Sequence, residues 1–203
     1  MSTITISRPE SRSLLSPAFH AISSCDLAPG QWVVVVGCGG VGQYAIQYAR
    51  AMNLNVLGLD VNDSALEQAK TLGATEILNT KSDPDAVKKL HEITKGGAHA
   101  AAIFSGAKSA FDTGLDCLKL NGLLMVVGMP KDPLQVDALD LVAGRYRIKG
   151  ESTSTPQRMK KAIDFTAEND IKSPATFYKL EDVHTMLAKM EKGQSNTKMI
   201  VLF

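Results

Sequence analysis

Three glycines at fixed spacing follow a run of four valines in the first quarter of the chain. The valines of residues 33–36 lead into Gly37-x-Gly39-x-x-Gly42, and an acid, Asp60, stands eighteen residues after the last glycine. In such a turn the first glycine permits a tight bend, the second lets the backbone approach a pyrophosphate, and the third lets a helix pack closely on a strand. The start of the following helix offers unpaired N–H groups and a partial positive charge to the phosphates. The spacing therefore predicts a dinucleotide site.

Asp60 bears on which dinucleotide this site would take. A carboxylate at the end of the second strand can accept hydrogen bonds from ribose hydroxyls. The alternative is a loop carboxylate near the cap of the next helix, for which Asn62 or Asp63 is the expected N-cap residue. The order of strand, glycines, helix and acid favours the ribose role. A carboxylate would repel a 2′-phosphate, and no arginine or lysine lies between Asp60 and Lys70. We therefore expect NAD rather than NADP.

A buried strand and a helix must hold the turn in place, and the chain continues this alternation well beyond Asp60. Strands are expected at residues 33–36, 55–59, 75–78, 99–105, 123–127 and 146–149. Between them we expect helices at residues 42–52, 64–72, 84–95, 107–120 and 134–143, so that the order is that of a parallel, doubly wound sheet. The sequence thus predicts an α/β fold with a six-stranded, mostly parallel Rossmann sheet.

Beyond Gly150 the pattern changes to two amphipathic helices and a terminal strand. Residues 156–166 and 183–190 carry apolar residues at helical spacing, including methionines that we expect to pack in the core, and residues 198–203 form an apolar run. We therefore expect three parts. These are a flexible leader at residues 1–12, an NAD-binding domain at residues 13–153 that includes a preceding helix, and a C-terminal helix–strand appendage at residues 154–203.

Composition and charge exclude several classes of function. The 203 residues include 22 basic and 21 acidic ones and few aromatic ones, so we expect neither nucleic-acid nor membrane binding. Cys25, Cys38 and Cys117 are widely separated, which suits a reducing compartment and not a disulfide framework. No secretory signal or transmembrane stretch is visible. These features predict a cytoplasmic protein.

Several motifs in order resemble the cofactor-binding half of the zinc-type medium-chain alcohol dehydrogenases, most closely the fungal members. They lie in residues 27–33, 37–42, 46–52, 69–74, 123–130, 179–183 and 198–203. The resemblance implies that Gly37, Gly39, Gly40 and Val41 hold the pyrophosphate and that Asp60 holds the adenosine ribose.

On the nicotinamide side, the resemblance implies a second group of residues at the ends of the fourth and fifth strands. These residues are Ser105, Gly106, Val127, Gly128 and Met129. The crevice outside the carboxyl ends of the strands is also where an open parallel sheet binds its ligands.

The resemblance also implies a preceding catalytic domain that supplies two zinc ligands and most of the substrate pocket, and we expect this domain to be absent from the chain. The third zinc ligand of the family corresponds to Ser13 or Ser16 here, and neither is a good zinc ligand. The histidines at positions 20, 91, 99 and 184 show no ligand spacing. We therefore predict no zinc.

Three functions remain open. The first is an NAD-dependent oxidoreductase that acts on an alcohol, carbonyl or enone without zinc. Its pocket would be completed by a homodimer, formed along the edge strand at residues 146–149 as in the family, or by a separate catalytic partner. The second is an NAD-binding module without redox turnover, and the third is a truncated product. No catalytic residue is assigned, since solvated or structural roles are favoured for His20 and Lys108.

Overall fold

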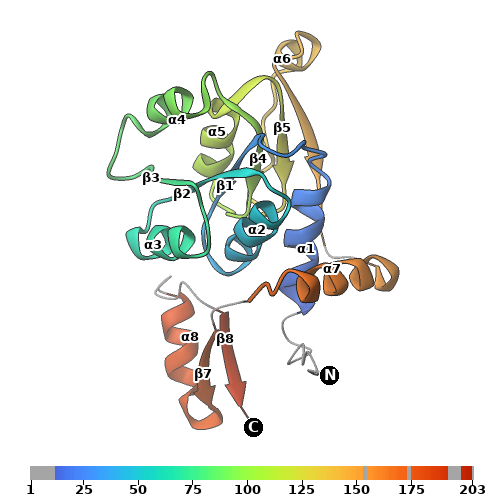
Figure 1. The fold of residues 1–203 in the computed structure, drawn as a ribbon. Helices are drawn as coiled ribbons and strands as arrows, with labels where there is room; N and C mark the ends of the chain where they lie inside the picture. Colours follow the sequence, from blue (N-terminus) through green and yellow to red (C-terminus); the bar gives the residue numbers. More distant parts are fainter. Residues whose placement is uncertain (1–11, 153–154, 173–174, 192–197, 203) are drawn as a thin grey trace.

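The computed structural model describes residues 12–152, 155–172, 175–191 and 198–202 (Figure 1). The expected leader therefore lies almost entirely outside the described residues, as does the expected boundary at residues 153 and 154. No helix in the described ranges is long and apolar enough to cross a membrane.

A six-stranded, wholly parallel sheet forms the centre of the fold (Figure 1). Its strands lie in the spatial order β3-β2-β1-β4-β5-β6. Their bounds are β1 (Trp32–Val36), β2 (Asn55–Asp60), β3 (Glu76–Asn79), β4 (Ala98–Ile103), β5 (Leu118–Val126) and β6 (Tyr146–Gly150). The predicted Rossmann-type α/β fold is thus confirmed, and β6 stands at one edge of the sheet.

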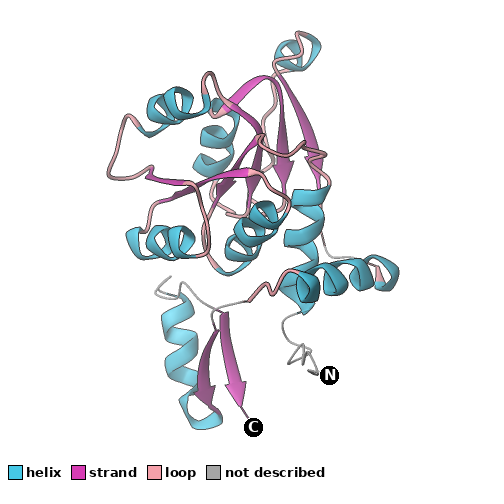
Figure 2. Cartoon of the chain, in the orientation of Figure 1, coloured by secondary structure: helices cyan, strands magenta, loops and turns pink. Residues whose placement is uncertain are grey.

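Helices cover both faces of this sheet, because alternate side chains of each strand point to opposite faces (Figure 2). One face, which includes Val33 and Val35, is covered by α1 (Arg12–Ser23), α2 (Gly40–Ala51) and α3 (Asp63–Thr71), and α7 (Pro156–Glu168) joins this core by packing on α1. The other face, with Val34 and Val36, packs against α4 (Ala86–Thr94) and α5 (Lys108–Asp116). The four valines are all nearly inaccessible, as a strand buried on both faces requires.

Helix α1 joins the core through a cluster of aromatic rings. Phe19 lies edge-on to Tyr48 of α2, with 5.4 Å between ring centroids, and contacts Phe165 of α7 at 5.2 Å. The Tyr48 hydroxyl and Thr166 Oγ1 of α7 are 2.6 Å apart, and both side chains are buried. Two segments more than 130 residues apart in the chain are therefore packed on the same helix, α2.

Several element bounds differ from those expected from the sequence. Residues 118–120 were expected to end a helix, but they begin β5, because α5 stops at Asp116. The partner of Ala98 is Leu118 and that of Ala100 is Leu123, so β5 bulges between these two pairs. Helix α6 (Ala138–Val142) is also shorter than predicted.

The C-terminal part contains one strand that the sequence did not predict. Strand β7 (Ala175–Lys179) pairs in parallel with β8 (Lys198–Leu202), and α8 (Val183–Glu191) contacts β7 after a short 3-10 turn at Leu180–Asp182. Met190 was expected in the core but is 56% exposed. The other large apolar residues exposed in this part are Phe177, Leu180, Leu187 and Leu202.

Candidate cofactor site

The predicted cofactor residues meet at the carboxyl ends of the parallel strands. The chain runs from β1 to β2 and β3 on one side and then returns to β4 on the other, so the strand order reverses between β1 and β4. An open α/β sheet binds ligands in the crevice at such a switch point. The glycine-rich turn follows β1, Asp60 ends β2, and the two nicotinamide-side segments follow β4 and β5.

The glycine-rich turn has one position that is tightly packed and one that is open. A Cβ on Gly42 would lie only 1.9 Å from the carbonyl oxygen of Gly37, so only glycine lets α2 approach β1 this closely. Gly37 itself has a φ of 94°, which favours glycine. A Cβ on Gly39, by contrast, would meet no atom within 4 Å. The second glycine therefore faces open space, where a ligand can approach the backbone.

The start of α2 forms the floor of this open space. Gly39 is the N-cap residue of α2, and no side chain caps the helix there. The first N–H groups of the helix, which begins at Gly40 and Val41, are therefore left for an anionic ligand, and the helix dipole favours negative charge at this end. The residues present thus fit a pyrophosphate group.

Asp60 is held beside the turn by three backbone N–H groups. Its Oδ2 accepts a hydrogen bond from Cys38 N at 2.7 Å, and its Oδ1 accepts from Val61 N at 2.7 Å and Asn62 N at 3.0 Å. Asn62 Oδ1 in turn caps α3, accepting from Ser64 N at 2.9 Å. The helix cap is therefore provided by Asn62, and the Asp60 carboxylate is fixed to the turn with the lone pairs that remain available to a ribose.

The loops after β4 and β5 close the other side of the crevice. A Cβ on Gly128 would lie 2.1 Å from Ser105 O, and one on Gly106 would lie 3.0 Å from Met129 O. A Cβ on Gly37 would come within 3.1 Å of Ser105 N, so these loops also touch the glycine-rich turn. Val127 packs partly against the core, whereas Met129 is 89% exposed.

Sequence reasoning missed one member of the site, the backbone N–H of Cys38. It joins the turn to Asp60, and a contact made by a main-chain N–H has no sequence signature. The Cys38 side chain is buried, and this burial raises the pKa of its thiol. The negative charge of Asp60 raises this pKa further.

The residues considered as metal ligands or proton carriers lie elsewhere. The rings of His20, His91 and His99 all hydrogen-bond to the backbone, with Arg158 O, Asp116 O and Trp32 N respectively. Ser16 is buried in α1. Within the described ranges, no group of three or more histidine, cysteine, aspartate or glutamate side chains is placed to hold a metal ion. The residues that the structure describes therefore do not fit a zinc site.

Comparisons with known proteins agree with this geometry. A family model described as zinc-binding dehydrogenase matches residues 40–168. An alcohol dehydrogenase of Geobacillus stearothermophilus is 35% identical over 184 residues, which make up 90% of this chain and 53% of the relative.

Solved structures give the same result. The alcohol dehydrogenase of Aeropyrum pernix has a TM-score of 0.84 and 25% identity, covering 92% of this chain and 55% of that one. Acetophenone reductase from Geotrichum candidum, solved in complex with NAD, has a TM-score of 0.79 and 27% identity, covering 93% of this chain and 53% of that one.

The chain spans about half the length of the relatives it matches. The matched half contains the parallel sheet and its glycine-rich turn, and the family model covers most of the chain. The chain therefore belongs to the zinc-binding dehydrogenase family, and it corresponds to the cofactor-binding half of that family's alcohol dehydrogenases.

Proposed function

We propose that this chain binds NAD(H) in the crevice between the glycine-rich turn and the loops after β4 and β5. The observation that carries the proposal is that the open backbone at Gly39 lies next to Cys38, whose N–H holds the carboxylate of Asp60. The start of α2 would hold the pyrophosphate, and Asp60 would accept hydrogen bonds from the adenosine ribose. When bound, the nicotinamide supplies the hydride chemistry.

The charges around Asp60 support NAD over NADP. The 2′-phosphate of NADP would lie close to the Asp60 carboxylate, and two negative charges close together repel each other. The next cation along the chain, Lys70, donates to Thr75 O and lies 3.9 Å from Glu76 Oε2. Lys70 is thus engaged at the far end of α3 and is not directed at a 2′-phosphate.

The activity that best suits this site is that of an oxidoreductase acting on an alcohol, carbonyl or enone without zinc. A homodimer through the exposed edge of β6, or a separate catalytic partner, would complete the substrate pocket. We expect no nucleic-acid or membrane partner, and we expect a cytoplasmic location. The second candidate is an NAD-binding module without redox turnover, which is supported by the absence of an assigned proton carrier among the residues that line the crevice in the described ranges.

Titration of the purified full chain with NADH, followed by its fluorescence, tests the cofactor proposal. We expect saturable binding, with NADPH binding more weakly. Asp60→Ala should weaken NADH binding about tenfold or more, because it removes hydrogen bonds to a charged group. Glu67→Ala, which removes an exposed carboxylate from α3, is the matched control and should leave the affinity unchanged.

Each outcome has a clear meaning. If the chain does not bind NADH, both candidate functions are wrong. If NADPH binds as tightly as NADH, the preference argued from Asp60 is wrong. A panel of aldehydes, ketones and enones then separates the two functions, since NADH consumption supports the oxidoreductase and binding without consumption supports the module.

A further inference from the structure

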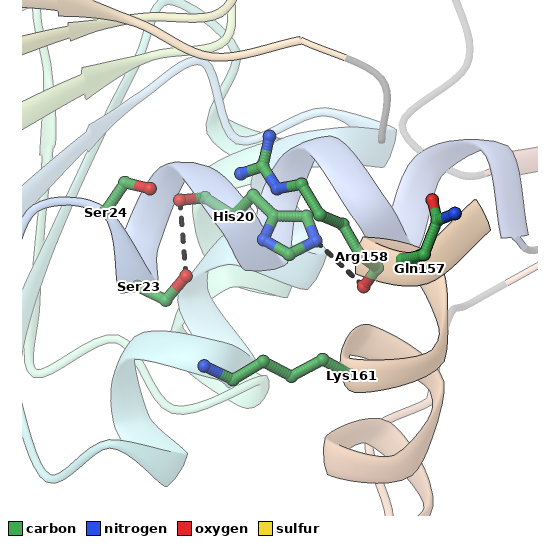
Figure 3. A pocket seen from close by; sticks show the side chains of 6 residues that line it. All are labelled: His20, Ser23, Ser24, Gln157, Arg158 and Lys161. Carbon is green, nitrogen blue, oxygen red and sulfur yellow. Dashed lines mark hydrogen bonds between the residues drawn. The ribbon is translucent and has the colours of Figure 1, made fainter. Parts of the chain in front are cut away.

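A second polar groove lies between the C-terminal end of α1 and the start of α7, apart from the cofactor crevice (Figure 3). It is open to solvent and has a volume of about 460 Å³. The residues that line it are His20, Ser23, Ser24, Gln157, Arg158 and Lys161. None of them belongs to the glycine-rich turn, to Asp60 or to the loops after β4 and β5.

His20 is a buried residue that lines this groove with part of its ring. The residue is only 5% exposed, and its Nε2 lies 3.1 Å from the carbonyl oxygen of Arg158. A carbonyl oxygen can only accept, so Nε2 carries the proton and Nδ1 of the neutral ring is an acceptor. Nδ1 has no hydrogen-bond partner in the described part of the chain. Figure 3 shows it on the side of the ring that faces Ser23 and Lys161.

The groove has more positive than negative charge. Glu151, which follows β6, accepts hydrogen bonds through Oε1 from Arg158 Nη2 at 2.9 Å and from Ser24 Oγ at 2.8 Å. Lys149 Nζ donates to Ser24 O at 3.3 Å. In Figure 3, Lys161 extends from α7 and ends below the labelled His20 and Ser23, and it forms no ion pair among the described residues. Two lining cations, Arg158 and Lys161, and the neighbouring Lys149 thus outnumber the one neighbouring carboxylate, Glu151.

We propose that this groove binds a phosphate group, with Lys161 Nζ, the Ser23 hydroxyl and a protonated His20 Nδ1 as its donors. The Ser23 hydroxyl donates to His20 O at 3.3 Å, a long bond that an anion oxygen can replace. A tetrahedral oxyanion has enough acceptor oxygens to receive several donors at once, and cationic side chains bind it through charge-assisted hydrogen bonds. Its source is either the free ion or a small phosphate monoester.

Binding at this site takes up a proton. Burial lowers the pKa of His20, and the positive charges of Arg158 and Lys161 lower it further. The hydrogen bond to the Arg158 carbonyl and the negative charge of Glu151 partly oppose this decrease in pKa. On α2, the other helix packed on α1, the titratable Tyr48 phenol is hydrogen-bonded to Thr166. The ring is therefore neutral near neutral pH, and a bound anion would favour its protonated form. Affinity should accordingly rise as the pH falls.

Calorimetric titration of the full chain with sulfate tests the site, because the charge of sulfate does not change over the pH range used. Between about pH 8 and about pH 6, we expect the affinity to rise about fivefold or more. Lys161→Met should weaken binding about fivefold or more. Lys160→Met is the matched control, since Lys160 lies on the same helix but pairs with Asp164 at 2.6 Å, and it should leave the affinity within about twofold.

His20→Gln should remove the pH dependence while Lys161→Met retains part of it. If His20→Gln fails to fold, the two lysine variants still decide the location of the site. The affinities of inorganic phosphate and glycerol 3-phosphate are then compared. Tighter binding of inorganic phosphate indicates the free ion as the ligand, and tighter binding of glycerol 3-phosphate indicates a phosphate monoester. Acetate should bind at least about tenfold more weakly than sulfate, and equal binding of acetate would overturn the assignment to a tetrahedral anion.

Two results would overturn the site itself. The first is sulfate binding that is equally tight in Lys161→Met and the wild type. The second is sulfate binding that saturating NADH abolishes, which would place the anion at the start of α2. Lys161→Met should retain the NADH affinity of the wild type, so failure of this site and failure of the cofactor proposal can be told apart.

Discussion

Replacing Gly42 with alanine should damage both the fold and the cofactor site, whereas the same change at Gly39 should damage the site alone. A Cβ on Gly42 would lie 1.9 Å from the Gly37 carbonyl oxygen, and both atoms are fixed to the backbone. They must separate by more than about 1 Å to reach an ordinary contact, which pushes α2 away from β1.

Overpacking of this kind costs about 1–3 kcal/mol of unfolding free energy. In a chain of this length, a loss of about 2 kcal/mol lowers the midpoint of thermal unfolding by about 4–8 °C. Because the start of α2 moves with the helix, we also expect Gly42→Ala to lose NADH affinity.

Gly39 offers the matched comparison on the same turn. Its Cβ would meet no atom within 4 Å, and its φ of −75° is ordinary for alanine. Since alanine is a poorer N-cap residue than glycine, the loss of unfolding free energy should be at most about 1 kcal/mol. The new methyl group would nevertheless occupy the place of the pyrophosphate, so we expect NADH affinity to fall about tenfold or more.

Thermal unfolding followed by circular dichroism, together with NADH titration of each variant, checks both parts. The reasoning is refuted if Gly39→Ala binds NADH as the wild type does, because the open face of Gly39 would then not be the ligand side. It is also refuted if Gly42→Ala unfolds at the wild-type temperature, because the close approach of α2 to β1 would then not require glycine.

Three other predictions concern the core. Burial lowers the pKa of His20 and His99, so the unfolded chain binds protons more tightly and the unfolding free energy should decrease below about pH 6.5; urea denaturation should show a smaller decrease in His20→Gln. Tyr48→Phe removes a buried hydroxyl that donates to a threonine and should cost about 1 kcal/mol by urea denaturation, while an unchanged midpoint would show that the bond adds no net stability. Burial raises the pKa of Cys25 and Cys117 to about 12, so a thiol reagent should label neither until the chain unfolds.

The glycine-rich turn could be predicted from the sequence because each of its requirements is local. The bend at Gly37, the open face at Gly39 and the close packing at Gly42 all lie within six residues, and the strand and helix on either side have strong periodic patterns. The N-cap of α3 could also be predicted from local sequence. Asn62 was one of two candidates for this position, and it is the residue that caps the helix.

Features that depend on distant residues could not be predicted. Strand β7 is short and pairs with β8, which begins more than 20 residues later, so no local pattern identifies it. Residues 118–120 continue the apolar pattern of α5 without a glycine or proline to end the helix, and only the pairing of Leu118 with Ala98 of β4 shows that β5 begins there. The contact of His20 with Arg158 spans 138 residues.

This last contact bears on how the chain folds as it is synthesised. Helix α1 precedes α7 by more than 130 residues, so the face that Phe19 turns toward Phe165 has no cover in a nascent chain until α7 has been synthesised. At about 5–20 residues per second, that delay is about 7–28 s. During this interval the apolar face of α1 around Phe19 lacks the cover that α7 provides. Helix α1 is thus fully packed only after α7, and a nascent chain arrested before Pro156 should need a chaperone more than the folded chain does.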